Sequence, residues 1–374
     1  MLKVLFMSKK SIRASIGLIL RYAVRYEPIG IIATASLIVA LMVPLFLRLR
    51  GPVQLDSGHQ LVMGTFARVV AVAADSDTAK KCIQAALKEI GKVDEMMSDY
   101  RDDSEISRVN REGFNRAVPV SEPTFEVLQR SIEFSQLTAG AFDITVGPLV
   151  DLWRSAEKKG TAPSEEEIAQ ARAKVGFEKL KLDETNKTVR FAMAGMRLDL
   201  GGIAKGYAVD KAIEAMQKAG AIGGMVDVGG DIRCFGKPPR GKKQWRIGLE
   251  DPNLTKDKSE SGLLLILKLD SAAVATSGDY QQFALIEGKR YSHILDRRSG
   301  TSAQGPASVT ILTDNATDAD ALATAVSVMG AEKGLALIKT IRGTEAILVT
   351  SQPEFRLTRT EGAERYIHKA ARSQ

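Results

Sequence analysis

LDLGGIAKGYAVDKA, residues 198–212, combines an apolar run, a double glycine and the start of a helical pattern. This order predicts a strand, a turn at the glycines and a helix that ends at Gly220. A helix start that follows glycines offers backbone N–H groups to an anion, and Lys205 adds a positive charge there. The stretch therefore predicts a phosphate-binding turn, although an ordinary strand-to-helix turn with an exposed lysine has the same pattern.

The segment TDADALATAVSVMG, residues 317–330, is the second candidate for site chemistry. Asp320 and Thr324 stand four residues apart and therefore share one face of the predicted helix. Magnesium favours one or two such oxygen ligands together with substrate phosphates. The alternative is a capping box between Thr317 and Asp320, in which the acid has only a structural role. A metal that bridges to the phosphate of the first motif would join the two segments in one site.

Four further features have both a functional and a structural interpretation. His293, in a predicted strand, is either a proton acceptor near neutral pH or a packed structural histidine. Tyr100, in the polar loop 98–110, is placed to stack on a planar ligand if a cleft lies there. Asp199, beside the double glycine, is able to accept a hydrogen bond from a ring N–H or a hydroxyl. GGDI, residues 229–232, predicts only a strand with a bend.

Helical and hairpin patterns alternate irregularly along the rest of the chain. Because a strict strand–helix–strand repeat is missing, the expected class is α+β, with a mixed, largely antiparallel sheet and packed helices. Cys82 and Cys234 are predicted to be buried free thiols. Strands are expected at 61–74, in a hairpin over 178–200 and through 222–313. Helices are expected at 77–97, from Ser121 to near Gly140, from a capping box at Ser164 and Glu167, at 317–329 and 332–341, and at the C-terminus.

The net charge of +7 over 374 residues comes entirely from the N-terminus. Residues 1–50 hold eight lysines and arginines and one acid, so the other 324 residues balance with 44 basic and 44 acidic side chains. A neutral body has no electrostatic footprint for the phosphate backbone of DNA or RNA. We therefore expect no nucleic-acid partner.

The 19 residues from Ile29 to Leu47 carry no charge, nearly the length that spans a bilayer. Six of the eight basic residues precede them, which predicts a cytoplasmic N-terminus and an exported body. Neither a small-residue cleavage site nor a cysteine for lipid attachment follows, so the segment is interpreted as an uncleaved anchor; a buried core helix would leave the basic flank unexplained. The expected organisation is a basic cytoplasmic segment at 1–28, a transmembrane anchor at 29–48, a linker at 49–59 and a catalytic domain at 60–374.

Eight blocks together resemble the flavin transferases of the ApbE family over about residues 60–350. They occur in the family's order: MGTFARV, SDYRDDSEISRVN, GAFDITVGPLVDLW, DLGGIAKGYAVD, VGGDIRCFG, ATSGDY, SHILDRRSG and TDADALATAVSVMG. The resemblance implies an enzyme that takes FAD, releases AMP and leaves FMN joined through its phosphate to a threonine or serine of an acceptor protein. It also implies a body related to the T-fold, with FAD in a cleft between two halves.

The resemblance also assigns roles to individual residues. It implies Mg²⁺ held by Asp320, Thr324 and the carbonyl of Gly202, with His293 as a base or positioning group, and it places Lys205 and Asp320 in the catalytic set. Many members have alanine at the position of Gly202, but a main-chain ligand needs no side chain. Some have an acid at Ala323, so the metal here would hold one more water. The flavin contacts match Met63, Tyr100, Ala141, Phe142, Asp143, Asp199, Lys205 and Leu295.

The sequence is also compatible with two other functions. An FAD pyrophosphatase would use water as the nucleophile and give FMN and AMP. A membrane-anchored, non-catalytic flavin-binding protein would need no metal, which the Asp320 and Thr324 pair disfavours. For the transferase, the expected partners are FAD and an exported acceptor protein, such as a subunit of a membrane redox complex. The expected location is a bacterial inner membrane, crossed once, with the catalytic domain on the periplasmic side.

Overall fold

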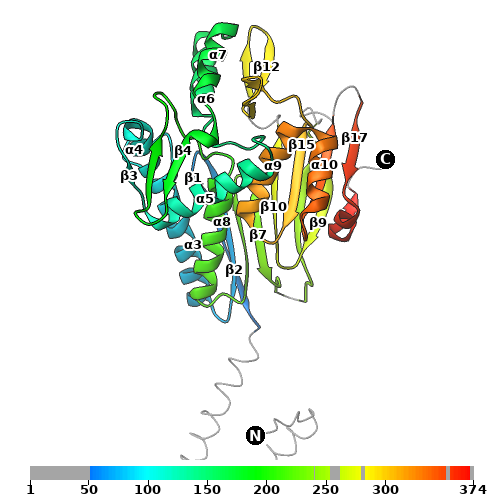
Figure 1. The fold of residues 1–374 in the computed structure, drawn as a ribbon. Helices are drawn as coiled ribbons and strands as arrows, with labels where there is room; N and C mark the ends of the chain where they lie inside the picture. The colour runs from blue at the N-terminus through cyan, green and yellow to red at the C-terminus, as the bar shows by residue number, and fades with distance from the viewer. Residues whose placement is uncertain (1–50, 240, 253–261, 279–282, 351–353, 371–374) are drawn as a thin grey trace, which may run out of the picture. The chain divides into compact units, whose positions relative to one another are not determined.

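The computed structural model describes residues 51–374 apart from 240, 253–261, 279–282, 351–353 and 371–374 (Figure 1). The chain divides after Pro52 into two compact units, and nearly all described residues belong to the second, Val53–Gln374. The predicted cytoplasmic segment and anchor, 1–28 and 29–48, lie outside the described residues. Within the described residues, no helix has both the length and the apolar character needed to cross a membrane.

An eight-stranded antiparallel sheet forms the centre of the second unit, and it confirms the predicted α+β class with a largely antiparallel sheet. Its strand order is β1-β2-β6-β7-β10-β15-β16-β17. Most strands that are adjacent in the sheet are therefore also consecutive in the numbering. The strands are β1 (Val53–Val62), β2 (Thr65–Ala73), β6 (Gly223–Val228), β7 (Asp231–Gly236), β10 (Ala272–Gly278), β15 (Ser308–Thr313), β16 (Glu345–Thr350) and β17 (Arg356–Arg359).

The central sheet is covered on both faces. Strand side chains alternate between faces, so in β2 Val69 and Ala71 join one core cluster while Val70 and Val72 join another. Each fully buried valine stabilises the fold by about 1.5–3 kcal/mol. The first cluster packs under helices (Figure 1): α3 (Ser76–Met97), α5 (Glu122–Leu137), α8 (Ala204–Lys218), α9 (Ala316–Met329) and α10 (Ala331–Thr340). The second packs against a three-stranded sheet of β18 (Ile367–Ala370), β9 (Leu263–Leu269) and β8 (Trp245–Glu250).

Several helices begin where the sequence predicts. The Ser121 hydroxyl caps α5, and Ser164 with Glu167 forms both hydrogen bonds of the predicted capping box at the start of α7 (Glu165–Ala173). The side chain of Asp75 accepts the N–H of Thr78 at 2.8 Å and caps α3. The helix predicted at 77–97 is confirmed, and its buried residues recur every three or four positions along one face.

Three elements differ from the expectation. β1 begins at Val53, inside the predicted linker 49–59, and its largely exposed, polar side chains explain why hydropathy did not reveal it. α4 (Glu105–Glu112) lies largely in the predicted loop 98–110. Its side chains are mostly polar, but Ile106 and Val109 are buried in the core on one face. The predicted C-terminal helix is a 3₁₀-helix, Glu361–Tyr366, followed by β18, which pairs with β9.

A smaller group of elements carries its own apolar cluster. α6 (Gly147–Lys159) and α7 pack against the hairpin of β11 (Phe283–Ile286) and β12 (Lys289–Ser292), and Figure 1 shows the three together at one end of the unit. The rings of Trp153 and Tyr291 lie 4.6 Å apart at the centre of this cluster. The remaining strands are β3 (Val118–Pro119), β4 (Leu180–Asp183), β5 (Thr188–Phe191), β13 (Leu295–Asp296) and β14 (Thr301–Ser302).

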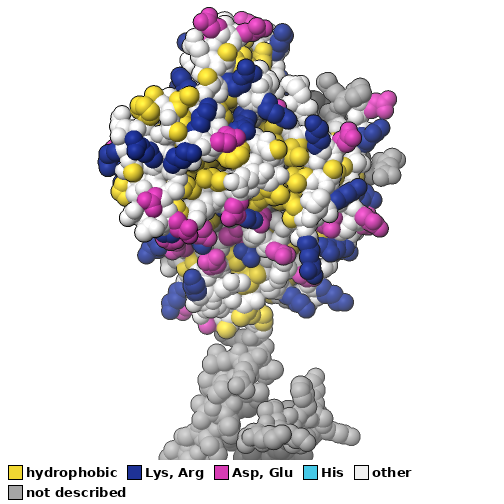
Figure 2. Space-filling view, viewed as in Figure 1, with side chains coloured by type: hydrophobic (Ala, Val, Ile, Leu, Met, Phe, Trp, Pro, Cys, Tyr) yellow, Lys and Arg dark blue, Asp and Glu magenta, His cyan; other side chains and the backbone are white. Residues whose placement is uncertain are grey.

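Charged side chains of both signs lie interspersed over the face shown in Figure 2. Yellow apolar patches separate them, and the dark blue and magenta side chains alternate without a continuous stripe of one sign. The surface on this side therefore gives no strong field of either sign.

Candidate functional site

The turn before α8 is held by side-chain and main-chain bonds rather than by a sheet. Asn110 Oδ1 accepts the N–H of Leu198 at 2.7 Å, and Asn110 Nδ2 donates to the Leu198 carbonyl at 3.0 Å. The N–H of Asp199 donates to the carbonyl of Ile144 at 2.8 Å. The predicted hairpin over 178–200 is confirmed by the pairing of β4 with β5, but its second strand ends at Phe191. The predicted continuation to Leu200 is wrong, because these partners satisfy the backbone groups that a neighbouring strand would satisfy.

The start of α8 meets α9 at very close range. A Cβ on Gly206 would lie 2.9 Å from the Cβ of Asp320 and would collide with the Ala316 carbonyl oxygen. The N–H of Gly206 donates to Asp320 Oδ2 at 3.1 Å, so a carboxylate of the protein itself lies at this helix N-terminus. Glycine at 206 is what allows the two helices to bring Lys205 and Asp320 together.

The capping-box interpretation of Asp320 is wrong. α9 begins at Ala316 with Asn315 as its cap, and the Asn315 side chain accepts the N–H of Asp318 at 2.8 Å. Thr317 is thus already inside the helix, where its hydroxyl donates to Asp210 at 2.6 Å. Asp320 has no capping role in α9, and its carboxylate faces α8 instead.

Asp210 on α8 fixes the position of α9. Its two oxygens accept the N–H groups of Ala316 and Thr317 at 2.9 Å each, together with the Thr317 hydroxyl. Arg233 of β7 donates to the same carboxylate at 2.7 Å. This buried acid therefore joins α8, α9 and the central sheet beside the candidate site.

A lysine between two buried acids forms the centre of the site. Lys205 Nζ lies 2.6 Å from Asp231 Oδ2 and 3.4 Å from both oxygens of Asp320. The side chains of Asp231 and Asp320 are only 4% and 3% exposed. Burial would lower the pKa of Lys205, but the two carboxylates outweigh it and raise that pKa. Burial and then the nearby Asp320 raise the pKa of Asp231, against the effect of Lys205.

Oxygen atoms of the kind that bind metal ions lie near this lysine. A Cβ on Gly202 would lie 2.9 Å from Thr324 Oγ1 and 3.3 Å from the ring of Phe142, so these residues are in close contact. Within the described residues the Thr324 hydroxyl makes no hydrogen bond, whereas Ser327 in the same helix donates to Ala323 O at 2.8 Å. A half-buried free hydroxyl one turn from a buried carboxylate fits a hard divalent cation.

A second cluster joins Tyr100 to Asp199 through Arg154 of α6. Arg154 donates to the Tyr100 hydroxyl at 2.6 Å and to Asp99 at 2.9 Å, and lies 3.6 Å from Asp199. The Tyr100 side chain is 76% exposed and so presents a ring face to solvent. Burial and the neighbouring Asp99 raise the pKa of Asp199, against the effect of Arg154 and Arg197.

Met63 lies in the turn between β1 and β2. Met63 and Gly64 both have positive φ, 52° and 69°, as a two-residue type I′ turn requires. The turn between β6 and β7, at Gly229, is its neighbour, because a Cβ there would lie 2.9 Å from the Thr65 side chain. Met63 is therefore placed at the end of the sheet at which β7 begins with Asp231.

The segments around residues 141–143 and 293–297 contact each other. Ala141 packs with Ile294, and Arg297 Nη1 lies 2.7 Å from Asp143. Asp143 also accepts bonds from Thr145 and the N–H of Phe177, so the protein itself engages both of its oxygens. This carboxylate is thus a structural crosslink between the two segments.

His293 and Leu295 lie beyond β12. His293 is exposed in a bend between β12 and β13, so the predicted strand at this position is wrong. Leu295 in β13 is buried with Leu149 and Trp153 of α6. The flavin-contact assignments of Leu295 and Asp143 remain predictions.

Comparison with known proteins identifies the family of the chain. A model of the ApbE family matches residues 63–348. This chain belongs to the ApbE family. The FAD:protein FMN transferase of Haemophilus influenzae is 36% identical to it over 271 residues, 71% of this chain and 76% of that protein. That of Vibrio cholerae is 37% identical over 267 residues, 71% and 77% of the two chains.

Solved structures of the ApbE family give the same result. The ApbE protein of Thermotoga maritima superposes with a TM-score of 0.74 at 33% identity, over 85% of this chain and 100% of that one. The flavin transferase ApbE of Vibrio cholerae gives 0.72 at 31% identity, over 84% and 99%. The predicted family is confirmed, and this ApbE-family chain is a transferase with the antiparallel α+β fold of its relatives.

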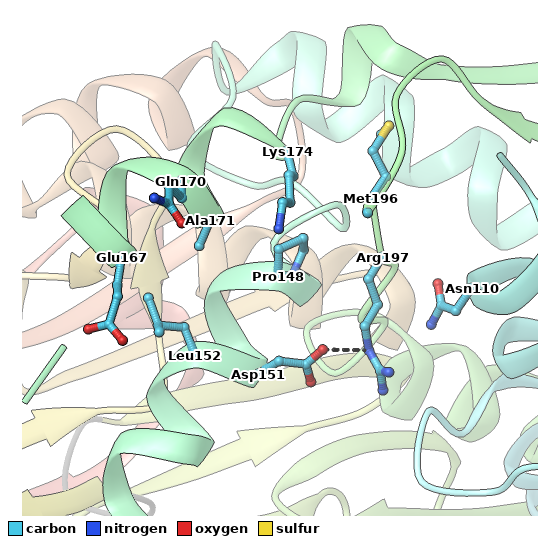
Figure 3. A pocket seen from close by; sticks show the side chains of 11 residues that line it. Asn110, Pro148, Asp151, Leu152, Glu167, Gln170, Ala171, Lys174, Met196 and Arg197 are labelled. Carbon is cyan, nitrogen blue, oxygen red and sulfur yellow. Dashed lines mark ion pairs between the residues drawn. The ribbon is translucent and has the colours of Figure 1, made fainter. Parts of the chain in front are cut away.

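A groove of about 440 Å³ lies beside the Tyr100 cluster in this ApbE-family chain. Figure 3 shows Asp151 of α6 paired with Arg197 across it, at 3.2 Å, and Arg197 also reaches Asp99 at 3.5 Å. None of the predicted site residues lines the groove. The groove adjoins the site through Arg197 and through Asn110, which holds Leu198 beside Asp199.

Two residues of this ApbE-family site are not apparent from the sequence. Asp231 lies in the GGDI segment, which predicts only a bent strand, and its carboxylate points at Lys205 across the sheet–helix interface. Arg154 lies on a polar helix face, where an arginine is ordinarily solvated. The double glycine before Asp231 is the single signal that marked a special position.

Proposed function

We propose that this chain is an FAD:protein FMN transferase that requires Mg²⁺. It would transfer FMN from FAD to a threonine or serine hydroxyl of an acceptor protein and release AMP. The observation that carries the proposal is the junction of α8 and α9, where Asp320, Thr324 and Gly202 lie beside Lys205. The names of the relatives, at 36% and 37% identity, support the same activity.

In this reaction the acceptor oxygen forms a bond to the FMN phosphorus, and the bond from that phosphorus to the bridging oxygen breaks. The bridging oxygen and its electron pair leave with AMP, and the hydroxyl proton passes to a base. Asp320, Thr324 and the backbone of Gly202 would hold Mg²⁺, which supplies charge neutralisation at the pyrophosphate when bound. Lys205 contributes positive charge in the same place. His293, exposed in its bend, is the proposed proton acceptor.

The flavin ring is proposed to bind near Tyr100, because its ring is exposed and its hydroxyl is fixed by Arg154. Asp199, 15% exposed in its side chain, is the proposed acceptor for a ring N–H. Asp199 and Gly202 are three residues apart, so the ring and the pyrophosphate would be held by two ends of one turn.

The test uses the full chain in detergent with FAD, Mg²⁺ and a candidate acceptor. Intact-mass measurement of the acceptor should show one added FMN phosphoester, and chromatography should show AMP. Asp320→Ala should reduce transfer by about 10²–10³-fold or more while circular dichroism stays unchanged. Full flavinylation by Asp320→Ala would contradict the metal assignment, and free FMN without labelled acceptor would indicate a pyrophosphatase.

We also propose that residues 29–48 anchor the enzyme in a bacterial inner membrane, with the catalytic unit on the periplasmic side and an exported acceptor, such as a redox-complex subunit. The uncharged run from Ile29 to Leu47 and the preceding basic residues support this. Protease added to spheroplasts should degrade the catalytic unit. Protection of that unit until the membrane is lysed would contradict the orientation.

A further inference from the structure

We propose that Asp231 is a positioning residue that holds Lys205 away from Asp320 and so keeps the Asp320 carboxylate available to the divalent cation. This rests on the proposed function, since it concerns the same cation. Asp231 stands outside the set of residues that would contact FAD or the metal. Its role would be exerted through Lys205 alone.

The distances show which of the two acids binds Lys205 more closely. Nζ of Lys205 is 2.6 Å from Asp231, a short charge-assisted hydrogen bond, and 3.4 Å from each oxygen of Asp320. Both acids are almost fully buried, so neither can exchange the lysine for water at low cost. Lys205 is therefore bound closely to Asp231 and only through two long, weaker hydrogen bonds to Asp320.

The three residues lie on separate elements of regular structure, which keeps the difference between the two distances. Lys205 lies in the first turn of α8, Asp320 in α9 and Asp231 at the first position of β7. Asp231 follows the turn at Gly229 and Gly230, whose φ values of 63° and 93° suit glycine, and it pairs with Val228 in the sheet. A carboxylate on a paired strand cannot follow the lysine if the lysine moves toward α9.

The physical consequence is a competition. An ammonium group and a divalent cation seek the same oxygens of Asp320, and a lysine fully paired with Asp320 would occupy them. With a neutral side chain at 231, Asp320 remains as the buried carboxylate that pairs with Lys205 among the described residues, and Nζ is drawn toward it. Asp231 therefore favours metal binding because it pairs with Lys205, the ammonium group that competes with the cation for Asp320.

Binding of Mn²⁺ to the full chain tests this, read by the loss of the free-ion electron paramagnetic resonance signal. Asp231→Asn should weaken Mn²⁺ binding about 10–100-fold, the range found when partners of metal ligands are removed. The double variant Asp231→Asn with Lys205→Met should recover most of that loss, because the competitor is gone. Recovery of affinity on removing a second residue is not expected of a purely structural defect.

Two further variants complete the design. Asp227→Asn is the matched control, because Asp227 lies across the same turn and accepts the N–H of Gly230, and it should leave Mn²⁺ affinity unchanged. Lys205→Met alone should bind Mn²⁺ at least as tightly as the wild type, which keeps the inference testable if Asp231→Asn does not fold. Thermal melts verify folding.

The outcomes separate the two proposals. Wild-type affinity in Asp231→Asn, no recovery in the double variant, or weaker binding by Lys205→Met would each overturn the inference while leaving the transferase assignment intact. If the wild type binds no Mn²⁺ even with FAD present, the proposed metal dependence itself is contradicted, and the inference falls with it.

Discussion

Arg154 links the loop that carries Tyr100 to the turn that carries Asp199. It donates to Tyr100 and Asp99 and lies 3.6 Å from Asp199, so one guanidinium holds residues from two segments of the chain. The Cζ atom of Arg154 also lies 4.5 Å from the centre of the Tyr100 ring. An arginine suits this position because its planar fork serves several acceptors at fixed angles.

We predict that Arg154→Ala weakens FAD binding about tenfold, because Tyr100 and Asp199 lose their common partner. The expected loss is near the low end for a hydrogen bond to a charged group, since the side chain is 34% exposed and screened by water. Fluorescence titration of FAD measures it. Arg101→Ala is the control, because that arginine is exposed and pairs only with nearby Asp103 among the described residues. Equal FAD affinity in both variants would contradict the prediction.

Single residues were predictable where local sequence determines their role. Asp320 and Thr324 share a helix face by spacing alone, whereas the contact of Thr324 with Gly202 was expected only from the family resemblance. Asp231 and Arg154 were not predictable, because Lys205 is 26 residues from the first and Tyr100 is 54 from the second. Sequence patterns contain no information on such contacts between elements.

At the scale of elements, the crossing of α8 and α9 determines the geometry of the site. Gly206 is the point of closest approach, and Asp210, one turn further along α8, caps the start of α9. Because Lys205 precedes Gly206 and Asp320 contacts it, any separation of the helices also separates the charged groups.

We predict that Gly206→Ala destabilises the protein by about 1–3 kcal/mol, because the added methyl collides with Ala316. Flavinylation should fall more than the loss of folded protein explains. Gly91→Ala in α3 is the matched control, since a Cβ there meets nothing within 4 Å and alanine should stabilise the helix by about 0.5–1 kcal/mol. Urea unfolding measures both. Equal stability of the two variants would show that the helices tolerate separation.

Helices were more predictable than edge strands for a physical reason. α3 has one apolar stripe over 22 residues, and hydroxyl or acid caps mark where helices begin. β1 lies at the edge of the sheet, and its side chains alternate between half-buried and exposed only from Val53 to Gly58, so the pattern is too short and too polar to identify a strand. The segment before α8 reads as a strand from its apolar residues, but those residues are buried around an irregular backbone held by Asn110.

At the scale of the whole molecule, the central sheet separates two cores that share its strands. Cys82 of α3 lies in the core under the helices, and Cys234 of β7 lies in the core under the second sheet. Both are free and buried, as predicted. Burial raises the pKa of each thiol, so the reactive thiolate is scarce in the folded protein.

We predict that neither thiol reacts with an aromatic disulfide reagent at pH 8 in the folded protein, and that both become reactive in one transition with denaturant. The shared strands make the two cores unfold together. Peptide mapping after labelling distinguishes Cys82 from Cys234, and circular dichroism gives the reference transition. Reaction of one thiol at lower denaturant than the other would show that the two cores unfold independently.

The pairing of β18 with β9 affects how the protein is made. The core under the second sheet includes Tyr366 and Ile367, and β9 forms its ladder with residues 367–370, about a hundred positions later in the chain. A ribosome must therefore release the chain through residue 370 before this layer can close. Until then β9 has an unpaired edge and its apolar residues lack one neighbour, the kind of exposed surface that favours aggregation of a growing chain.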